Sequence, residues 1–274
     1  MVLASVTIPE NKINEFEKLD IKDSKKHSKN RREELFNIIV NNYIVKYEIL
    51  EANIIDKLME TTNLNKIELM AFGKLINSNL KEIWPNFKEI KVNNNSNNNN
   101  NSNSNKNNNN SNKNTTVEIY IDACSSNEIA FGNQLKNILI VNNSNIKIIS
   151  EHKADDNYKI VSAASIVAKV IRDRKIEEYK KIYGNIGSGY PSDKITQKYL
   201  KEYIIKYNKP PIIARKSWST TKKLMKYIND KNNGKNINNS KIIKKNIDLK
   251  KNRFNTINTD NKNNKTVQTK LVEI

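Results

Sequence analysis

Two aspartates stand out because each closes a run of apolar and β-branched residues. Asp122 ends the strand-like part of "TVEIYIDA", and Asp155 ends "IKIISEHKAD". In open α/β sheets, ligands bind where the chain leaves the carboxyl ends of the strands. Two carboxylates at that edge of a basic protein can hold a divalent cation against a phosphate oxygen. An aspartate after a strand is also a common turn former or helix cap, so spacing alone leaves both interpretations open.

Basic side chains follow on the helix that is predicted after Asp155. Lys169 and Arg172 lie three residues apart in "VSAASIVAKVIRDRKIEEYKKIYG". This spacing makes them neighbours on a helix surface, so both can face one phosphate region. The alternative is a solvated helix face on which Lys169 pairs with Asp173.

Two further segments offer candidate contacts. Tyr190 stands between Gly189 and Pro191 in "GSGYPSD", and its residue types alone indicate an aromatic side chain in a turn. The lysines of "IKDSKKHSK" are candidates for contacts with a nucleic-acid backbone, namely Lys22, Lys25 and Lys26.

Periodicity predicts the elements that position these residues. Apolar alternation predicts that Val117, Ile119 and Ile121 share one face of a strand, which turns Asp122 to the other face. Strands mixed with helices, followed by helices alone, indicate an α/β sheet domain with a helical appendage. Strands are expected within 1–10, 44–53, 116–123 and 146–155, and helices over 28–43, 63–80, 161–184 and 194–207, with a last helix that begins near Ser217. Ser28 and Ser162 are the expected caps of the helices over 28–43 and 161–184.

Asparagine-rich stretches reduce the part of the chain that can form a core. Residues 92–114 have no apolar periodicity and predict a disordered insertion, because such a segment cannot repay its ordering entropy by burial. From about Asn229 to the end, Asn and Lys again dominate and predict a flexible basic tail. We therefore expect a single domain over 1–228, interrupted by the insertion, with a core large enough to be stable.

Charge and cysteine content limit the partners and the compartment. The 48 Lys and Arg against 29 Asp and Glu give a net charge of +19, which favours polyanionic partners such as nucleic acid. The single cysteine, Cys124, excludes an internal disulfide and suits a reducing compartment. With His27 and His152 as the two histidines, a structural zinc site is not expected. We expect a monomeric cytoplasmic protein that has no membrane span.

A family resemblance rests on segments that occur in a fixed order. They are "IKDSKK", "RREELF", "NLNKIE", "YIDAC", "EHKADDNYKIVSAASIVAKVIRDR", "GSGYPSD" and "ARKSWST". Together they closely resemble ribonuclease HII, especially its archaeal form, from Val2 to about Lys226. The resemblance implies a ribonuclease H-like mixed sheet flanked by helices, with a C-terminal helical subdomain.

The resemblance also implies an activity in DNA replication and repair. It implies a metal-dependent endonuclease that uses Mn²⁺ or Mg²⁺. This enzyme would cut the RNA strand of RNA·DNA hybrids, and single ribonucleotides embedded in DNA, to leave 3′-hydroxyl and 5′-phosphate ends. Family members place four carboxylates around two ions. Asp122 and Asp155 match the third and fourth carboxylates, Asp156 is an unmatched neighbour, and Tyr190 matches the tyrosine that lies against the ribose and detects its 2′-hydroxyl.

The other half of that site is missing from the sequence. The family's first two carboxylates belong to an Asp-Glu-Ala-Gly-Arg-Gly motif on the first, central strand, and this sequence contains no such motif. Met1 aligns with an interior position of the family, so we expect the first central strand to be absent. Three interpretations remain open: an active nuclease whose recorded start lies downstream of the real one, a truncated relative that binds nucleic acid without cleaving it, and an unrelated basic binding protein.

The end of the chain suggests one more partner. In "QTKLVEI", Gln268, Leu271 and Ile274 are spaced as in the clamp-binding box at the end of some family members. The segment lacks the paired aromatic residues of that box. It predicts a sliding clamp as a partner of the tail.

Overall fold

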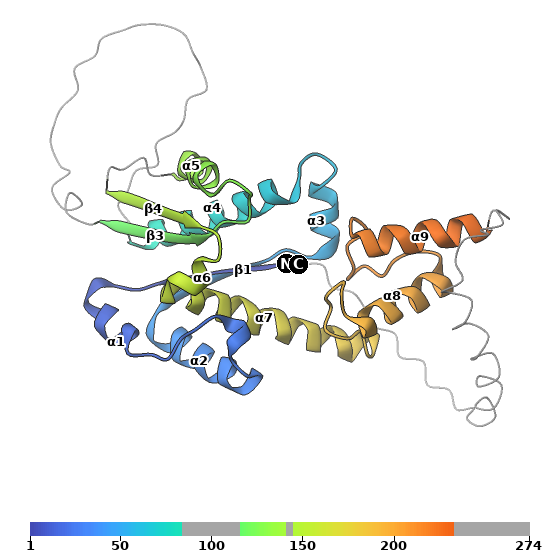
Figure 1. Cartoon of the computed structure of the whole chain (residues 1–274), viewed down its shortest axis with the longest axis horizontal. Helices are drawn as coiled ribbons and strands as arrows, with labels where there is room; N and C mark the ends of the chain where they lie inside the picture. The colour runs from blue at the N-terminus through green and yellow to red at the C-terminus, as the bar shows by residue number, and fades with distance from the viewer. Residues whose placement is uncertain (84–115, 141–144, 233–274) are drawn as a thin grey trace, which may run out of the picture. The chain divides into compact units, whose positions relative to one another are not determined.

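The computed structural model describes residues 1–83, 116–140 and 145–232 (Figure 1). The chain divides into two compact units, Met1–Met225 and Lys226–Ile274. The predicted insertion at 92–114 and the tail segment with Gln268 lie outside the described residues. Within the described ranges, none of the helices has the length and apolar character needed to cross a membrane.

The first sheet is an antiparallel pair formed by β1 (Val2–Thr7) and β2 (Ile44–Ile49). Val2 lies opposite Ile49, and Thr7 lies opposite Ile44. Both faces of β1 are covered. Leu3 packs in a cluster with Ala71 and Leu75 of the helix α4 (Leu64–Ile83). Val6 packs in a cluster with Val167 of the helix α7 (Lys159–Tyr183).

The second sheet is a parallel pair formed by β3 (Val117–Asp122) and β4 (Ile146–Glu151). A parallel pair needs a crossover, and α5 (Glu128–Ile138) provides it. Ile121 is buried in a core cluster with residues of α4 and α5, as the alternation of apolar residues predicts. Asp122, one residue on, is exposed.

Local capping explains where several helices begin. Ser28 caps α2 (Lys29–Asn42) by accepting a hydrogen bond from the backbone nitrogen of Arg31 at 3.2 Å, as expected from the sequence. The sequence also suggests Ser162 as the cap of α7, and this is wrong. α7 begins at Lys159, and the Ser162 hydroxyl donates to the backbone oxygen of Asp155. The remaining helices are α1 (Ile13–Glu17), α3 (Ala52–Leu58), α4 (Leu64–Ile83), α6 (Ala154–Asn157), α7 (Lys159–Tyr183), α8 (Lys194–Tyr207) and α9 (Ser219–Asn232), with short 3₁₀ turns at Glu10–Lys12 and Ser24–Lys26.

The two sheets remain separate in the described part of the chain. β1 pairs with β2 and β3 with β4, and none of the strands described there joins the pairs. α9 continues to Asn232, so it includes the first four residues of the tail predicted from Asn229.

A cleft of about 1680 Å³ lies where β1 and β3 face each other. Its walls also include residues of α4 and α7, among them Leu75 and Ala164. Asn79 lines this cleft and is buried. Its Nδ2 donates to the Ser5 hydroxyl at 2.8 Å, but its Oδ1 has no hydrogen-bond partner. The cleft therefore contains a buried acceptor that the described residues leave unpaired.

Candidate functional site

The two aspartates singled out by the sequence come together at one edge of the second sheet. Asp122 is the last residue of β3 and lies opposite Glu151, the last residue of β4. Lys153 adopts a left-handed conformation with φ 56°, and α6, which carries Asp155, follows at once. Because β3 and β4 are parallel, their carboxyl ends meet at the same edge. Both aspartates line the cleft beside β1.

The electrostatics of Asp155 reflect this convergence. Burial raises the pKa of Asp155, and the nearby negative charges of Asp122 and Asp23 raise it further. The positive charge of Lys25 acts in the opposite direction. A partly buried carboxylate that is repelled by its neighbours is typical of a site that gains stability when it binds a cation.

The basic segment with Lys25 and Lys26 lies beside this edge. Lys25 is 81% exposed at the side chain and lies 3.9 Å from Asp23, so it can reach a ligand. Lys26 instead forms an ion pair with Asp156 at 2.8 Å. That hydrogen bond lowers the pKa of Asp156.

The donor atoms suit a hard cation, but the set is incomplete. Carboxylate oxygens are the ligands that Mg²⁺ and Mn²⁺ prefer. Within the described ranges, however, no group of three or more His, Cys, Asp or Glu side chains is arranged to hold a metal. Asp122 and Asp155 therefore offer two carboxylates of the kind that such a cation binds.

Tyr190 lies on a loop between α7 and α8 whose backbone requires glycine. Gly187 and Gly189 have φ angles of +72° and +73°, which side-chain-bearing residues rarely adopt. A Cβ on Gly187 would lie 2.7 Å from the backbone nitrogen of Thr196, and one on Gly189 would lie 2.6 Å from Cδ1 of Ile176. The loop is therefore pressed closely against both helices.

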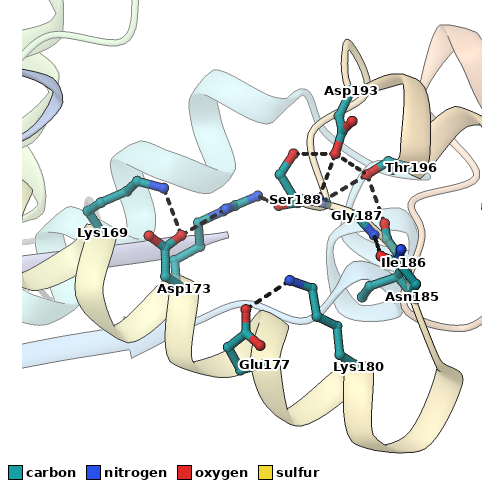
Figure 2. Close-up of polar contacts among 12 residues, drawn as sticks. Lys169, Asp173, Glu177, Lys180, Asn185, Ile186, Gly187, Ser188, Asp193 and Thr196 are labelled. Carbon is teal, nitrogen blue, oxygen red and sulfur yellow. Dashed lines mark hydrogen bonds and ion pairs between the residues drawn. The ribbon is translucent and has the colours of Figure 1, made fainter. Parts of the chain in front are cut away.

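Asp193 holds this loop in place (Figure 2). Its Oδ2 accepts hydrogen bonds from the backbone nitrogen and hydroxyl of Ser188 at 2.6 and 2.7 Å, and from the Thr196 hydroxyl at 3.2 Å. Its Oδ1 accepts from the backbone nitrogen of Ile195 at 2.9 Å and so caps α8. These bonds lower the pKa of Asp193 to about 2. The sequence-based prediction overlooked Asp193, although an Asp directly before a helix is a recognisable cap signal.

Lys169 and Arg172 lie beside Tyr190, on the helix face that the sequence predicts. The Lys169 ammonium is 5.4 Å and the Arg172 guanidinium 3.8 Å from the centre of the Tyr190 ring. Both cations also contact Asp173, at 2.7 and 3.0 Å from Oδ1. The alternative pairing of Lys169 with Asp173 is thus present, and it coexists with the position beside Tyr190.

α7 connects the carboxylate pair to this tyrosine. Ser162, which contacts the backbone of Asp155, lies ten residues before Arg172 on α7. At a rise of about 1.5 Å per residue, the two ends of the site are roughly 15 Å apart along the helix. A few nucleotides of a nucleic-acid strand, at about 3.4 Å each, span this distance.

Comparisons with known proteins show the family to which the chain belongs. The ribonuclease HII family model matches residues 1–117 and 106–221. A ribonuclease HII from Methanococcus aeolicus is 65% identical over 251 residues, which cover 91% of this chain and 84% of the relative. One from Methanocaldococcus jannaschii is 41% identical over 229 residues, or 82% of this chain and 88% of the relative.

Solved structures show the same fold. The ribonuclease H2 of Pyrococcus horikoshii matches with a TM-score of 0.62 and 28% identity, covering 84% of this chain and 99% of the other. The ribonuclease HII of Archaeoglobus fulgidus, solved in complex with PCNA, matches with a TM-score of 0.60 and 29% identity, covering 81% and 88%. The chain therefore has a ribonuclease H-like fold and belongs to the ribonuclease HII family.

Proposed function

We propose that this protein cleaves the RNA strand of RNA·DNA hybrids and cuts DNA at single embedded ribonucleotides, leaving 3′-hydroxyl and 5′-phosphate ends. The observation that carries the proposal is the arrangement of Asp122 and Asp155 at one sheet edge, joined through α7 to the loop that carries Tyr190. The net charge of +19 favours a polyanionic substrate.

The aspartates are proposed as ligands of a divalent cation, Mn²⁺ or Mg²⁺. When bound, such an ion would activate water and stabilise the leaving oxygen. The raised pKa of Asp155 supports this role because a cation would relieve the repulsion between the two carboxylates. A Bst ribonuclease HIII, which shares only the fold with this chain at 15% identity, was solved with Mn²⁺.

The remaining ligands are proposed to lie on a strand that the 274-residue sequence does not contain. The family resemblance implies an Asp-Glu-Ala-Gly-Arg-Gly strand at the centre of the sheet. The cleft between β1 and β3 supports this proposal, because it lies between the two sheets and borders both Asp122 and Asp155. The unpaired Oδ1 of Asn79 could accept a hydrogen bond from that strand.

Substrate contacts are assigned to three side chains near the two ends of the site. Tyr190 is 45% exposed, and we propose that its ring lies against the ribose, where the 2′-hydroxyl distinguishes RNA from DNA. Lys25 is free to contact a phosphate near the carboxylate pair. Lys169 contributes positive charge beside the tyrosine.

A second candidate function is binding without cleavage. It is favoured by the presence of only two converging carboxylates in the described part of the chain, since two are too few to fix a pair of divalent ions. The test is to incubate the protein with a DNA duplex that carries one ribonucleotide, with Mn²⁺, with Mg²⁺ or with EDTA. Metal-dependent nicking that Asp122→Asn abolishes supports the nuclease. Tight binding without nicking supports the second candidate.

Further partners and location are also proposals. The PCNA complex of the Archaeoglobus fulgidus relative supports a sliding clamp as a partner. The segment assigned to that contact, "QTKLVEI", lies outside the described residues. Titration of this peptide against the clamp tests the assignment, and absence of binding at high micromolar concentration would end it. We propose a monomer in the cytoplasm, which sedimentation and cell fractionation can test.

A further inference from the structure

Arg172 uses both ends of its guanidinium within the protein. Nη1 donates to Oδ1 of Asp173 at 3.0 Å, and Nη2 donates to the backbone oxygen of Ser188 at 2.6 Å. The side chain is 20% exposed. Both terminal nitrogens of Arg172 therefore have a partner within the protein before any substrate arrives.

The face of the same guanidinium lies against Tyr190. Its central carbon is 3.8 Å from the ring centre, which is within the range of a cation–π contact. Because Arg172 also bonds to Ser188, it contacts the loop at two points that flank Gly189. One side chain thus contacts both the ring of Tyr190 and the backbone of the same loop at Ser188.

Helix α8 fixes the other side of the loop. Asp193 binds both polar groups of Ser188, and the Thr196 hydroxyl accepts from the backbone nitrogen of Gly189 at 3.0 Å. The backbone nitrogen of Asp193 in turn donates to the backbone oxygen of Tyr190 at 3.1 Å. Tyr190 therefore has little freedom except at its exposed edge.

We infer that Arg172 is a positioning residue for Tyr190, and that it is not a contact to the phosphate backbone. This inference rests on the proposed role of Tyr190 at the ribose, and it revises the sequence-based expectation that Arg172 presents its charge to a phosphate. The planar guanidinium can stack on a ring and donate to Ser188 at once, whereas a lysine ammonium cannot do both.

The experiment compares Arg172→Gln and Arg172→Lys with Tyr190→Ala in the full chain, and uses Lys25→Gln as the control for a phosphate contact. Binding is measured by fluorescence anisotropy to two duplexes of equal length, one all DNA and one with a single ribonucleotide, over a series of salt concentrations. Hydrogen exchange of the loop over residues 184–193 is measured on the same proteins without nucleic acid.

A positioning role predicts a specific pattern. Both Arg172 variants should lose preference for the ribonucleotide by about 2- to 30-fold, the range expected from a cation–π contact. Their salt dependence should match that of the unmodified chain, whereas Lys25→Gln should reduce the log–log slope by about 1. Loop exchange should increase in both Arg172 variants and remain unchanged in Lys25→Gln. Combining Arg172→Gln with Tyr190→Ala should add no further loss of preference.

Other outcomes overturn the inference. A salt slope reduced by Arg172→Gln but kept by Arg172→Lys would identify a phosphate contact. Unchanged loop exchange in Arg172→Gln would show that the guanidinium does not hold the loop. If the unmodified chain shows no preference for the ribonucleotide, the proposed function of Tyr190 fails, but loop exchange still decides whether Arg172 positions it.

Discussion

Substitution of Gly189 by alanine tests the close contact between the Tyr190 loop and α7. The residue has a φ of +73°, a left-handed conformation that costs a side-chain-bearing residue about 1–2 kcal/mol. The new Cβ would lie 2.6 Å from Cδ1 of Ile176 and 3.3 Å from Nη2 of Arg172. Relief of this overlap requires Ile176 to leave its rotamer, which costs about 0.5–1.5 kcal/mol.

We therefore expect Gly189→Ala to lower the free energy of unfolding by about 2–3 kcal/mol, a large part of a usual total of about 5–15 kcal/mol. Urea denaturation followed by circular dichroism measures this change. The matched control is the same substitution in an Ile176→Ala background, where the cost should be smaller because the overlapping methyl group is gone. A loss below about 1 kcal/mol, or strictly additive effects of the two substitutions, would refute the steric argument.

Three other predictions concern the carboxylates and the tyrosine. In a chain extended by a strand that carries Asp-Glu-Ala-Gly-Arg-Gly, Asp122→Asn should reduce turnover by several powers of ten while binding of the hybrid persists. Near-normal cleavage by this variant would remove Asp122 from the site. The raised pKa of Asp155 means that its contribution to stability is complete below the ordinary aspartate pKa and is lost as pH rises through the raised value. Asp155→Asn should flatten that part of the stability curve measured by urea denaturation over pH, and an unchanged curve would contradict the electrostatic assignment. Tyr190→Ala should slow cleavage at a lone ribonucleotide far more than it weakens binding to plain DNA, and equal losses would indicate a folding defect instead.

The sequence predicted those features that depend on local pattern. Alternation placed Ile121 in the core and Asp122 outside it. The parallel order of β3 and β4 then brought Asp155 to the same edge, as the rule for strand ends predicts. Ser28 was recognisable as a cap because it directly precedes good helix formers.

The features that it missed depend on tertiary contacts. From the sequence, Arg172 is expected to be a surface cation. The structure shows that its guanidinium instead donates to the backbone of Ser188 and stacks on the ring of Tyr190. Ser162 resembles a cap, but the backbone of Asp155 lies close enough to take its hydroxyl and the helix begins earlier. The Ser188 partner lies 16 residues and the Asp155 partner 7 residues away in sequence, beyond the spacings of three and four residues that helical periodicity reports.

The most direct test of the account is a nicking assay on a duplex with one embedded ribonucleotide, in Mn²⁺ and with EDTA as a control. The 274-residue chain is compared with the same chain extended by a strand that carries Asp-Glu-Ala-Gly-Arg-Gly. We predict little or no cleavage by the first and metal-dependent cleavage by the second, because the proposed metal site needs carboxylates in addition to Asp122 and Asp155. Robust cleavage by the 274-residue chain alone would contradict the claim that the additional carboxylates are required.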